Sequence, residues 1–422
     1  MNLKEKLAQL ERSHLAIIGS TPEPATPRLD SSSFLPGEQY ATASGSCWRN
    51  RIEFELHHRH GQFELNYLLR HASEHLQLVA KKLAFSHVKM NRLLFIDTET
   101  TGLSGGIGTL AFLIGVGYFD GNRFVIEQYL MQRFEEERVL LRILFDLIEK
   151  YSQTDGALVS FNGKSYDLPL LINRGIFHRL LSTTPQFLHL DLLHPARRLW
   201  KNALIECSLN RLETAVLQIQ RTGDVPGSLI PEIYFRFLRT GDPRPLAAVL
   251  HHNQLDILSM VVLLQRMLHL YASKLPAATV PVDWLAMGEA FDQIQKYDDG
   301  LEFYSRLLQQ DLPLPIRKQV LLRLALLYKK QRNYAAAIVL WQQALSHAGF
   351  TLEPYEELAK AYEHRLADLQ KAKSYSLQAL ENIQLLKQIS EQQVYTEEEQ
   401  RLRWRLQRLD AKLKRKTKIN GI

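Results

Sequence analysis

Two acidic residues two positions apart are the strongest chemical signal in this chain. Asp97 and Glu99 follow the mainly apolar segment 92–96, and residues two apart in a strand face the same side of a sheet. Neighbouring carboxylates repel each other, and their burial is unfavourable unless a cation joins them. Mg²⁺ and Mn²⁺ take oxygen ligands, and paired ions about 4 Å apart serve phosphodiester cleavage. The pair therefore indicates a metal site, with an exposed strand end carrying two solvated acids as the alternative.

Two more carboxylates lie in segments that suit the same chemistry. Asp167 follows the predicted strand 157–161, where its alternative role is to cap a helix that has Pro169 in its first turn. Asp256 lies among apolar residues of the segment 251–258, where a single Asp is usually solvated. Each acid alone has a structural explanation, and only the four together favour a metal site.

The segments resemble the motifs of the DEDD 3′→5′ exonucleases, a superfamily with a ribonuclease H-like fold that includes the DnaQ-like proofreading nucleases. Asp97-x-Glu99, with Thr-Gly-Leu after it, is similar to the first motif. Asn162-x-x-x-Tyr166-Asp167 is similar to the second motif, in the form found in family B polymerase proofreading domains. The motifs also keep the family's order along the chain.

The third motif of this family holds the last carboxylate and a general base. Asp256 matches the carboxylate. One branch of the family has a His five residues before it, here His251, and the other has a Tyr four residues before it, a position that His252 occupies. Spacing slightly favours His251, whereas the second motif favours the branch in which His252 replaces tyrosine. Either imidazole, with an ordinary pKa near 6.5, suits proton transfer from water at neutral pH.

The resemblance covers residues 92–270 and implies a metal-dependent nuclease. The expected reaction is 3′→5′ exonucleolytic hydrolysis of phosphodiester bonds in DNA or RNA, with two divalent cations, Mg²⁺ or Mn²⁺, as cofactors. The alternative is a catalytically weak or inactive nucleic-acid-binding or scaffold protein that acts through helical repeats. The implied metal ligands are Asp97, Glu99, Asp167 and Asp256. The predicted substrate contacts, of which Lys164 has a solvated loop position as its alternative, are Thr98, Asn162, Lys164 and Tyr166.

Alternating strand and helix patterns place these motifs in an α/β domain. A helix is expected at 135–150, and a hairpin turn at Asp120-Gly121-Asn122. The expected strands are 92–97, 110–119, 124–131 and 157–161. We therefore expect an α/β ribonuclease H-like domain over residues 91–272, with a mixed sheet flanked by helices.

The residues before this domain fall into two parts. Residues 1–46 are predicted to form a weakly ordered segment, because the stretch 21–46 is rich in Pro, Ser, Thr and Gly. Residues 47–90 are expected to form a strand-and-helix lead-in to the nuclease domain, with a helix at 65–83. Three histidines near a strand end indicate a surface turn rather than a metal site. They are His57, His58 and His60.

The sequence Arg-Thr-Gly-Asp occurs twice, at 221–224 and at 239–242. Both copies are predicted to be helix stops, with Gly past the helix end and Asp opening the next element. This interpretation requires no binding role for either copy.

A helical repeat pattern follows over residues 283–382. Aromatic residues recur at spacings of 37 and 34, and small residues keep the same step; they are Phe291, Tyr328, Tyr362, Gly288, Ala325 and Ala359. A period near 34 of paired helices is typical of tetratricopeptide repeats, so an all-α tetratricopeptide-like helical repeat domain is expected. Such a solenoid usually binds a protein partner on its concave surface, and packing of the repeats on the first domain is the alternative.

This combination of domains resembles the YprB-like ribonuclease H-like proteins of bacteria, which join such a domain to tetratricopeptide repeats. The likeness extends to Gly105-Gly106-Ile107-Gly108-Thr109 and to the run 191–200. In that run, Trp200 with Arg197 and Arg198 suits a nucleic-acid groove or, equally, an amphipathic helix that covers the sheet.

Composition and charge narrow the remaining possibilities. Of 422 residues, 45% are hydrophobic and 23% are charged, which excludes collagen-like, mucin-like and wholly disordered chains. Two cysteines are too few for a disulfide framework. We find no apolar stretch near the ~20 residues of a membrane span, which predicts a cytoplasmic protein without membrane contact. Residues 401–418 carry nine basic residues and one acid, a net +8 in a chain of net +7. A helical basic tail over 383–422 is therefore expected, which suits nucleic-acid phosphates or forms a solvated helix face.

Overall fold

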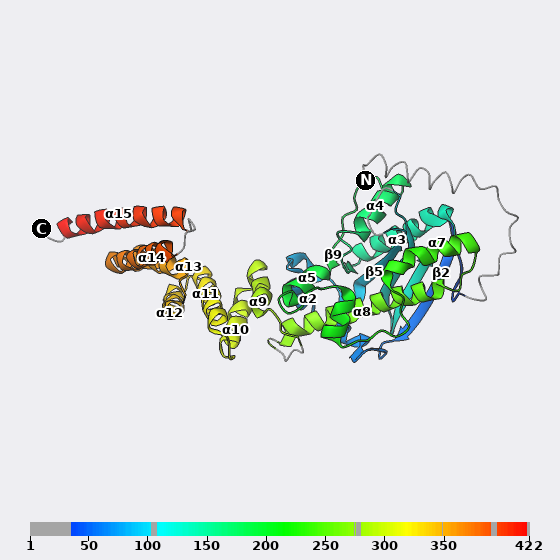
Figure 1. Ribbon diagram of the computed structural model, residues 1–422, viewed down its shortest axis with the longest axis horizontal. Coiled ribbons are helices and arrows are strands. Elements are labelled where there is room, and N and C mark those ends of the chain that lie inside the picture. Colours follow the sequence, from blue (N-terminus) through cyan, green and yellow to red (C-terminus); the bar gives the residue numbers. More distant parts are fainter. Residues whose placement is uncertain are drawn as a thin grey trace. The chain divides into compact units, whose positions relative to one another are not determined.

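The computed structural model divides the chain into two compact units (Figure 1). The residues described are 35–102, 108–273, 275, 280–347, 349–389 and 395–419. The first unit is α/β, and the second is helical. This arrangement confirms the predicted fold class. The first unit comprises Met1–His60, Asn91–His189 and Gln220–Val261, and the second comprises Gly61–Met90, Leu190–Ile219 and Val262–Ile422. Two segments expected beside or within the nuclease domain, 61–90 and 190–219, therefore group with the helical unit by their contacts.

The described residues of the first unit form a mixed sheet of seven strands in the order β1-β2-β7-β6-β5-β8-β9. Neighbours from β1 to β5 are antiparallel, and β5 pairs with β8 in parallel. The strands are β1 (Glu38–Thr42), β2 (Gly45–Glu55), β5 (Leu93–Thr100), β6 (Ala111–Asp120), β7 (Arg123–Leu130), β8 (Ala157–Ser160) and β9 (His189–Asp191). The four strands and the hairpin turn expected from the central block are confirmed to within a few residues.

Residues 38–46 differ from the expectation of weak order. They form β1 and the start of β2, with Tyr40 opposite Cys47 in the register. Leu35 and Trp48 are buried beside them. The prediction was wrong here because pairing with a neighbouring strand, rather than a local apolar pattern, orders an edge strand. Residues 1–34 lie outside the described part of the chain.

Helices pack on this sheet and carry part of the site. The apolar side of α3 (Glu137–Ser152) is buried, as its spacing predicts. The ring of Tyr234, on α7 (Ile230–Thr240), stacks on Phe112 of β6 with a centroid separation of 3.9 Å. The other helices of this part are α4 (Asp167–Phe177) and α8 (Leu246–Ser273).

Two glycines on β6 let α8 approach the sheet closely. A Cβ atom added at Gly115 would lie 2.0 Å from Asn253 Oδ1, and one at Gly117 would lie 2.5 Å from Ile257 Cγ2. Residues two apart share one face of a strand, so both glycines face this helix. The sheet surface under α8 is therefore bare backbone, which brings the polar residues of α8 next to β5.

Among the described residues, α8 is the one helix that is long and apolar enough to cross a membrane, judged by length and composition alone. The sequence analysis expected no apolar stretch of this length. It missed α8 because polar residues interrupt the apolar ones, although the mean hydropathy of the helix is high. In the structure 72% of that apolar window is buried, as in the core helix of a folded domain.

The lead-in segment differs from the predicted single helix at 65–83. A 3₁₀ turn (Leu65–Arg70) is followed by α2 (Ser73–Ala80), which ends at Lys81 in the left-handed conformation with φ 53°. His60 is buried, 6% exposed, and its Nε2 lies 2.7 Å from Ser259 Oγ, so a surface turn is wrong for this histidine. The remaining short elements are β3 (Arg59–His60), β4 (Phe63–Glu64), α5 (Leu193–Trp200), α6 (Leu209–Leu212), a π turn (Glu213–Leu217) and 3₁₀ turns at Leu83–His87, Met90–Arg92, Phe134–Glu136 and Gly227–Leu229.

Paired helices build the second unit, at the positions that the sequence period predicts. Successive helices contact each other from α9 to α15. A Cβ atom at Gly288 would lie 2.4 Å from the ring of Tyr304, which explains the small residue at that step. The tetratricopeptide class itself stays a prediction from the period. The helices are α9 (Trp284–Gln293), α10 (Tyr297–Leu308), α11 (Leu314–Lys330), α12 (Tyr334–Leu345), α13 (Leu352–His364), α14 (Leu369–Ile389) and α15 (Thr396–Ile419).

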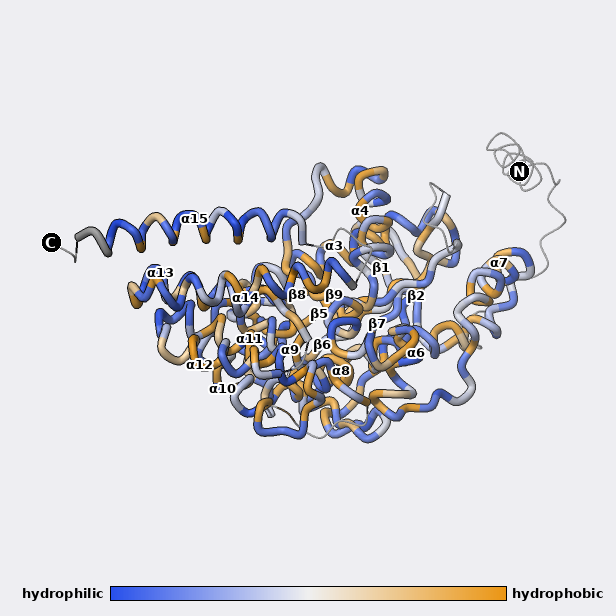
Figure 2. Tube along the Cα trace, turned by 60° about the vertical axis from the view of Figure 1, so that its left-hand side comes forward, coloured by the Kyte–Doolittle hydropathy of each residue, from blue (hydrophilic) through white to orange (hydrophobic). Residues whose placement is uncertain are grey.

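The basic C-terminal segment is a packed helix. Hydrophilic residues predominate along α15, with apolar ones recurring among them (Figure 2), and Leu402 and Leu409 are buried. The side chain of Glu363, on α13, is fully buried and pairs with three basic residues of α15. These are Arg405, Arg408 and Lys412. Part of the charge that predicts a phosphate-binding tail therefore serves packing within the helical unit.

Candidate active site

Three elements of the first unit bring the four predicted carboxylates together. Asp97 and Glu99 lie on β5, Asp167 is the first residue of α4, and Asp256 lies on α8. Contacts with shared neighbours place them in one cluster. Thr98, between Asp97 and Glu99, donates to Asp167, and His252 Nε2 lies within 4.0 Å of both Glu99 and Asp256. Residues separated by 159 positions along the chain, from 97 to 256, thus share a site because β5 lies next to both β8 and the helix that covers β6.

Negative charge dominates this cluster. Burial raises the pKa of Asp97 well above its ordinary value, and the neighbouring Asp256, Glu99 and Asp167 raise it further. Burial, then Asp256, Asp167 and Asp224, raises the pKa of Glu99 in the same way. A cation bound among these groups would favour their charged forms. The chemistry of the donor set therefore suits a hard divalent ion.

Protein donors nevertheless hold three of the carboxylates. Asn253 Nδ2 donates to Asp97 Oδ2 at 2.8 Å, and the Thr98 hydroxyl donates to Asp167. The Arg221 guanidinium pairs with Asp256. Among the described residues, no group of three His, Cys, Asp or Glu side chains is arranged to hold a metal ion. The residue types suit Mg²⁺ or Mn²⁺, whereas the arrangement is that of carboxylates bound to protein partners.

A buried amide network fixes Asn253 below Asp97. Asn50 Nδ2 donates to Gln128 Oε1 at 2.8 Å. Gln128 Nε2 in turn donates to Asn253 Oδ1 at 2.9 Å and to the Leu250 carbonyl at 2.6 Å. With its oxygen engaged, Asn253 presents its NH₂ group to Asp97. The network therefore positions the first carboxylate of the site.

One imidazole faces the carboxylates. His252 Nε2 lies 3.7 Å from Asp256 Oδ2 and 4.0 Å from Glu99 Oε1. Its Nδ1 lies 2.8 Å from Asp224 Oδ1. His251 is the adjacent helical residue and points about 100° away from it. The geometry thus places His252, rather than the histidine that spacing slightly favours, beside the carboxylates.

The predicted substrate residues of the second motif lie in the loop before α4. Asn162 adopts the left-handed conformation, φ 65°, which Asn tolerates better than most residues. A Cβ atom at Gly163 would lie 2.5 Å from Ser160 Oγ, so the loop requires glycine there. Lys164 is exposed and Tyr166 is 59% exposed. The loop therefore presents a cation and an aromatic ring to solvent next to Asp167.

The comparisons with known proteins agree with this domain. The family model described as RNase_H superfamily matches residues 94–268, the segment that holds all four carboxylates. The uncharacterized protein YprB of Bacillus subtilis (strain 168) is 33% identical over 344 residues, which cover 79% of this chain and 80% of that protein.

The chain belongs to the YprB family. The predicted ribonuclease H-like domain is confirmed, and this superfamily indicates a nuclease-type activity. The tetratricopeptide part of the resemblance stays a prediction.

Sequence reasoning missed three residues of this site: Arg221, Asp224 and Asn253. The first two belong to the first Arg-Thr-Gly-Asp copy, for which the prediction of a helix stop was wrong, because the preceding turn already ends at Leu217. Although burial opposes the effect, Arg221 and His252 hold the pKa of Asp224 below its ordinary value. The repetition of the four residues was a signal, but the second copy is a true helix stop, so the signal could not separate the two.

Two further segments carry the resemblance to the YprB-like proteins, the glycine-rich run 105–109 and the run 191–200. Residues 105–107 of the glycine-rich run lie outside the described part of the chain. In the run 191–200, Trp200 is 1% exposed and Asp191 Oδ1 accepts from the Leu193 amide at 3.0 Å. Arg198 donates to the Val79 carbonyl at 2.6 Å. These contacts show that one side of α5 packs within the helical unit.

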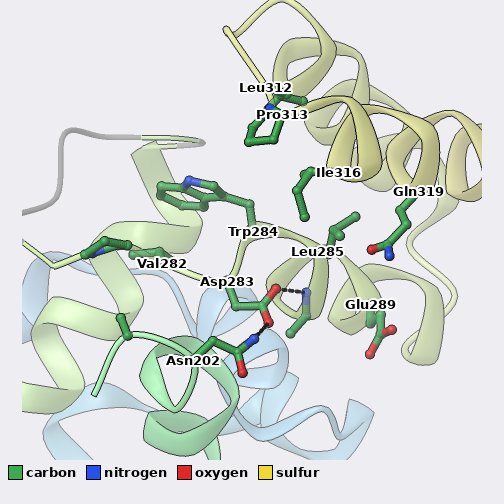
Figure 3. Close-up of a pocket in the computed structure, with 13 residues that line it drawn as sticks. Asn202, Val282, Asp283, Trp284, Leu285, Glu289, Leu312, Pro313, Ile316 and Gln319 are labelled. Atoms are coloured by element: carbon green, nitrogen blue, oxygen red, sulfur yellow. Dashed lines mark hydrogen bonds between the residues drawn. The ribbon is translucent and has the colours of Figure 1, made fainter. Parts of the chain in front are cut away.

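A pocket of about 710 Å³ in the helical unit is a second candidate site (Figure 3). Trp284, Leu285 and Ile316 contribute apolar surface to it. Asp283 accepts from the Ala286 amide at 2.9 Å and from Asn202 Nδ2 at 2.7 Å, so its carboxylate caps α9. The pocket thus offers apolar surface without a free catalytic group among these residues.

Proposed function

We propose that the first unit is a metal-dependent 3′→5′ exonuclease that hydrolyses phosphodiester bonds of DNA or RNA. One observation carries this proposal: the carboxylates of three distant motifs lie together with an imidazole in a domain of the ribonuclease H superfamily. A purely structural role does not explain why a fold would gather four acids whose charges oppose each other's ionisation.

Asp97, Glu99, Asp167 and Asp256 would hold two divalent cations, Mg²⁺ or Mn²⁺. When bound, such ions polarise the phosphate, lower the pKa of a water molecule and neutralise developing charge. Asn253 donates a hydrogen bond to Asp97, and Thr98, which lies between Asp97 and Glu99 on β5, donates one to Asp167. In this proposal these two polar residues position the metal ligands.

His252 is the general base in this proposal. If its Nδ1–H donates to Asp224, its Nε2 lone pair is left facing the space beside Glu99 and Asp256, where it can take a proton from water. Asp224 then holds the tautomer and orientation of the ring and stabilises its protonated form, as the carboxylate of a catalytic triad does.

The loop before α4 would bind the nucleic-acid strand. The Lys164 ammonium can pair with a backbone phosphate, and the Tyr166 ring, 59% exposed, can stack on a base. Asn162 shapes the loop through its left-handed backbone. Stacking and phosphate contacts are tolerant of sequence, which agrees with an exonuclease that removes one nucleotide after another.

The second candidate is a catalytically weak or inactive nucleic-acid-binding or scaffold protein that uses its helical repeats. The pairing of Arg221 with Asp256 favours it, because a guanidinium on a ligand carboxylate opposes cation binding. Retained binding without cleavage would distinguish this candidate from the nuclease.

The test is cleavage of 5′-labelled single-stranded DNA and RNA by the full-length protein with Mg²⁺, with Mn²⁺ and with chelator. We expect a metal-dependent ladder that shortens from the 3′ end, lost in Asp97→Asn and kept in the matched surface variant Asp242→Asn. No cleavage with either metal would exclude the nuclease and leave the scaffold.

A further inference from the structure

A buried arginine lies within the carboxylate cluster. The side chain of Arg221 is 7% exposed, and its guanidinium pairs with Asp256 and, at 3.0 Å, with Asp224 Oδ2. The planar guanidinium has several N–H donors in a fixed fork, which suits two carboxylates at once. Arg221 is therefore a fixed positive charge at the fourth proposed metal ligand.

Both oxygens of Asp256 face protein groups. Oδ1 accepts from Arg221, and Oδ2 lies 3.7 Å from His252 Nε2. By contrast, Asp97 accepts from the neutral amide of Asn253. A divalent ion that uses Asp256 must displace a charged partner, whereas one that uses Asp97 competes only with a neutral donor.

We propose that Arg221 competes with one of the two divalent cations for Asp256. The cation site at Asp256 is therefore weaker than the cation site at Asp97 and Glu99. This inference rests on the proposed function of the same cluster. It predicts that the chain binds one cation tightly and a second one weakly. Cleavage then depends on the divalent-ion concentration that fills the weaker site.

The inference is tested by calorimetric titration of Mn²⁺ into the full-length protein. The wild type is expected to bind two ions with dissociation constants at least tenfold apart, and Arg221→Gln should tighten the weaker one by about tenfold or more. Arg239→Gln is the matched control, since Arg239 opens the second Arg-Thr-Gly-Asp copy and is exposed; it should titrate like the wild type.

A second variant keeps the test valid if Arg221→Gln does not fold. Arg221→Lys retains a charge but loses the fork, and it should tighten the weaker site about threefold. Unchanged or weaker Mn²⁺ binding in both variants would overturn the inference and leave the nuclease proposal standing. A wild type and variants that bind no Mn²⁺ at all would overturn both.

Discussion

The sequence Arg-Thr-Gly-Asp occurs twice in one unit of this protein, and the two copies occupy different environments. In the first, Arg221 and Asp224 are 7% and 15% exposed and contact Asp256 and His252. In the second, Gly241 ends α7 with φ 69°, and Asp242 binds Arg244, whose side chain is 66% exposed. The same four residues therefore supply charges to a candidate active site in one place and stop a helix in the other.

The surroundings explain this difference. The second copy spans the end of α7, where Arg239 and Thr240 are exposed. The first copy follows a π turn (Glu213–Leu217) and a left-handed residue, Gln218, and it lies against the part of α8 that carries Asp256. A short motif specifies its backbone, whereas its neighbours in the fold decide what its side chains do.

The largest expected effect is a difference in cleavage rate between two variants. One changes Asp256, which Arg221 of the first copy contacts, and the other changes Asp242 of the second copy. Asp256→Asn should lower the exonuclease rate roughly 10³-fold, about 4 kcal/mol of transition-state stabilisation, because it removes a proposed metal ligand. Asp242→Asn should leave the rate within about twofold. Rates on labelled oligonucleotides with Mn²⁺ check this, with melting curves as the control for folding. Equal rates for both variants would end the functional distinction between the two copies.

Acid is expected to weaken the fold through His60. Burial, with the charge of Arg221, lowers the pKa of His60 from 6.5 to about 4. The unfolded chain takes up this proton near pH 6.5 and the folded chain only near pH 4. The unfolded state therefore binds more protons between these values, and the free energy of unfolding falls as the pH falls. The loss assigned to His60 is on the order of 3 kcal/mol between pH 7 and pH 4.

Urea unfolding of the wild type and of His60→Gln measures this loss as a difference between the two proteins. Arg221→Gln should reduce the loss, because the positive charge that contributes to the low pKa of His60 is gone. Arg239→Gln should leave it unchanged. An equally steep loss in His60→Gln would contradict the assignment to this histidine.

The histidine that Asp224 contacts is expected to matter more than its neighbour. His252→Gln should lower kcat roughly 10²-fold, the usual contribution of a general base, whereas His251→Gln should change it less than threefold. Single-turnover cleavage separates this effect from binding. The reverse order would assign the base to His251, as the family spacing slightly favours, and would remove the catalytic part of Asp224.

The smallest effect concerns the backbone that both copies share. Gly223 and Gly241 have φ values of 70° and 69°, and no atom lies within 4 Å of a Cβ placed on either. Alanine at each position should therefore cost about 1 kcal/mol of unfolding free energy through strain alone. Chemical denaturation measures both. A cost several times larger at Gly223 would show that the site constrains the backbone of the first copy as well as its side chains.

Local patterns in the sequence were sufficient for much of the fold. The apolar runs around Phe95 and Val159 became β5 and β8, and Gly121, with φ 55°, makes the hairpin turn between β6 and β7. The 34- to 37-residue period placed the helix pairs, with second helices starting at Tyr297 and Tyr334. Each of these depends on residues close together in the chain, so sequence alone determines them.

The candidate site needed more than local pattern. The motif residues Asp97, Glu99, Asp167 and Asp256 were available from the sequence because a family resemblance links distant segments. Their partners were not, since nothing near Asn253 in the chain indicates that Gln128 orients it or that Gly115 makes room for it. The packing of α15 on Glu363 belongs to the same class, because its basic partners lie 42 to 49 positions away in the sequence.

By itself, the sequence determined the chemistry available to this protein: four acids at motif spacing, two histidines, and a fold class read from strand and helix periods. Only the tertiary structure decided which histidine faces the acids and which Arg-Thr-Gly-Asp copy joins them. The physical reason is that charge and hydrogen bonding act over a few ångströms in space. The packing of α8 on a glycine-lined strand brings residues more than a hundred positions apart within that range.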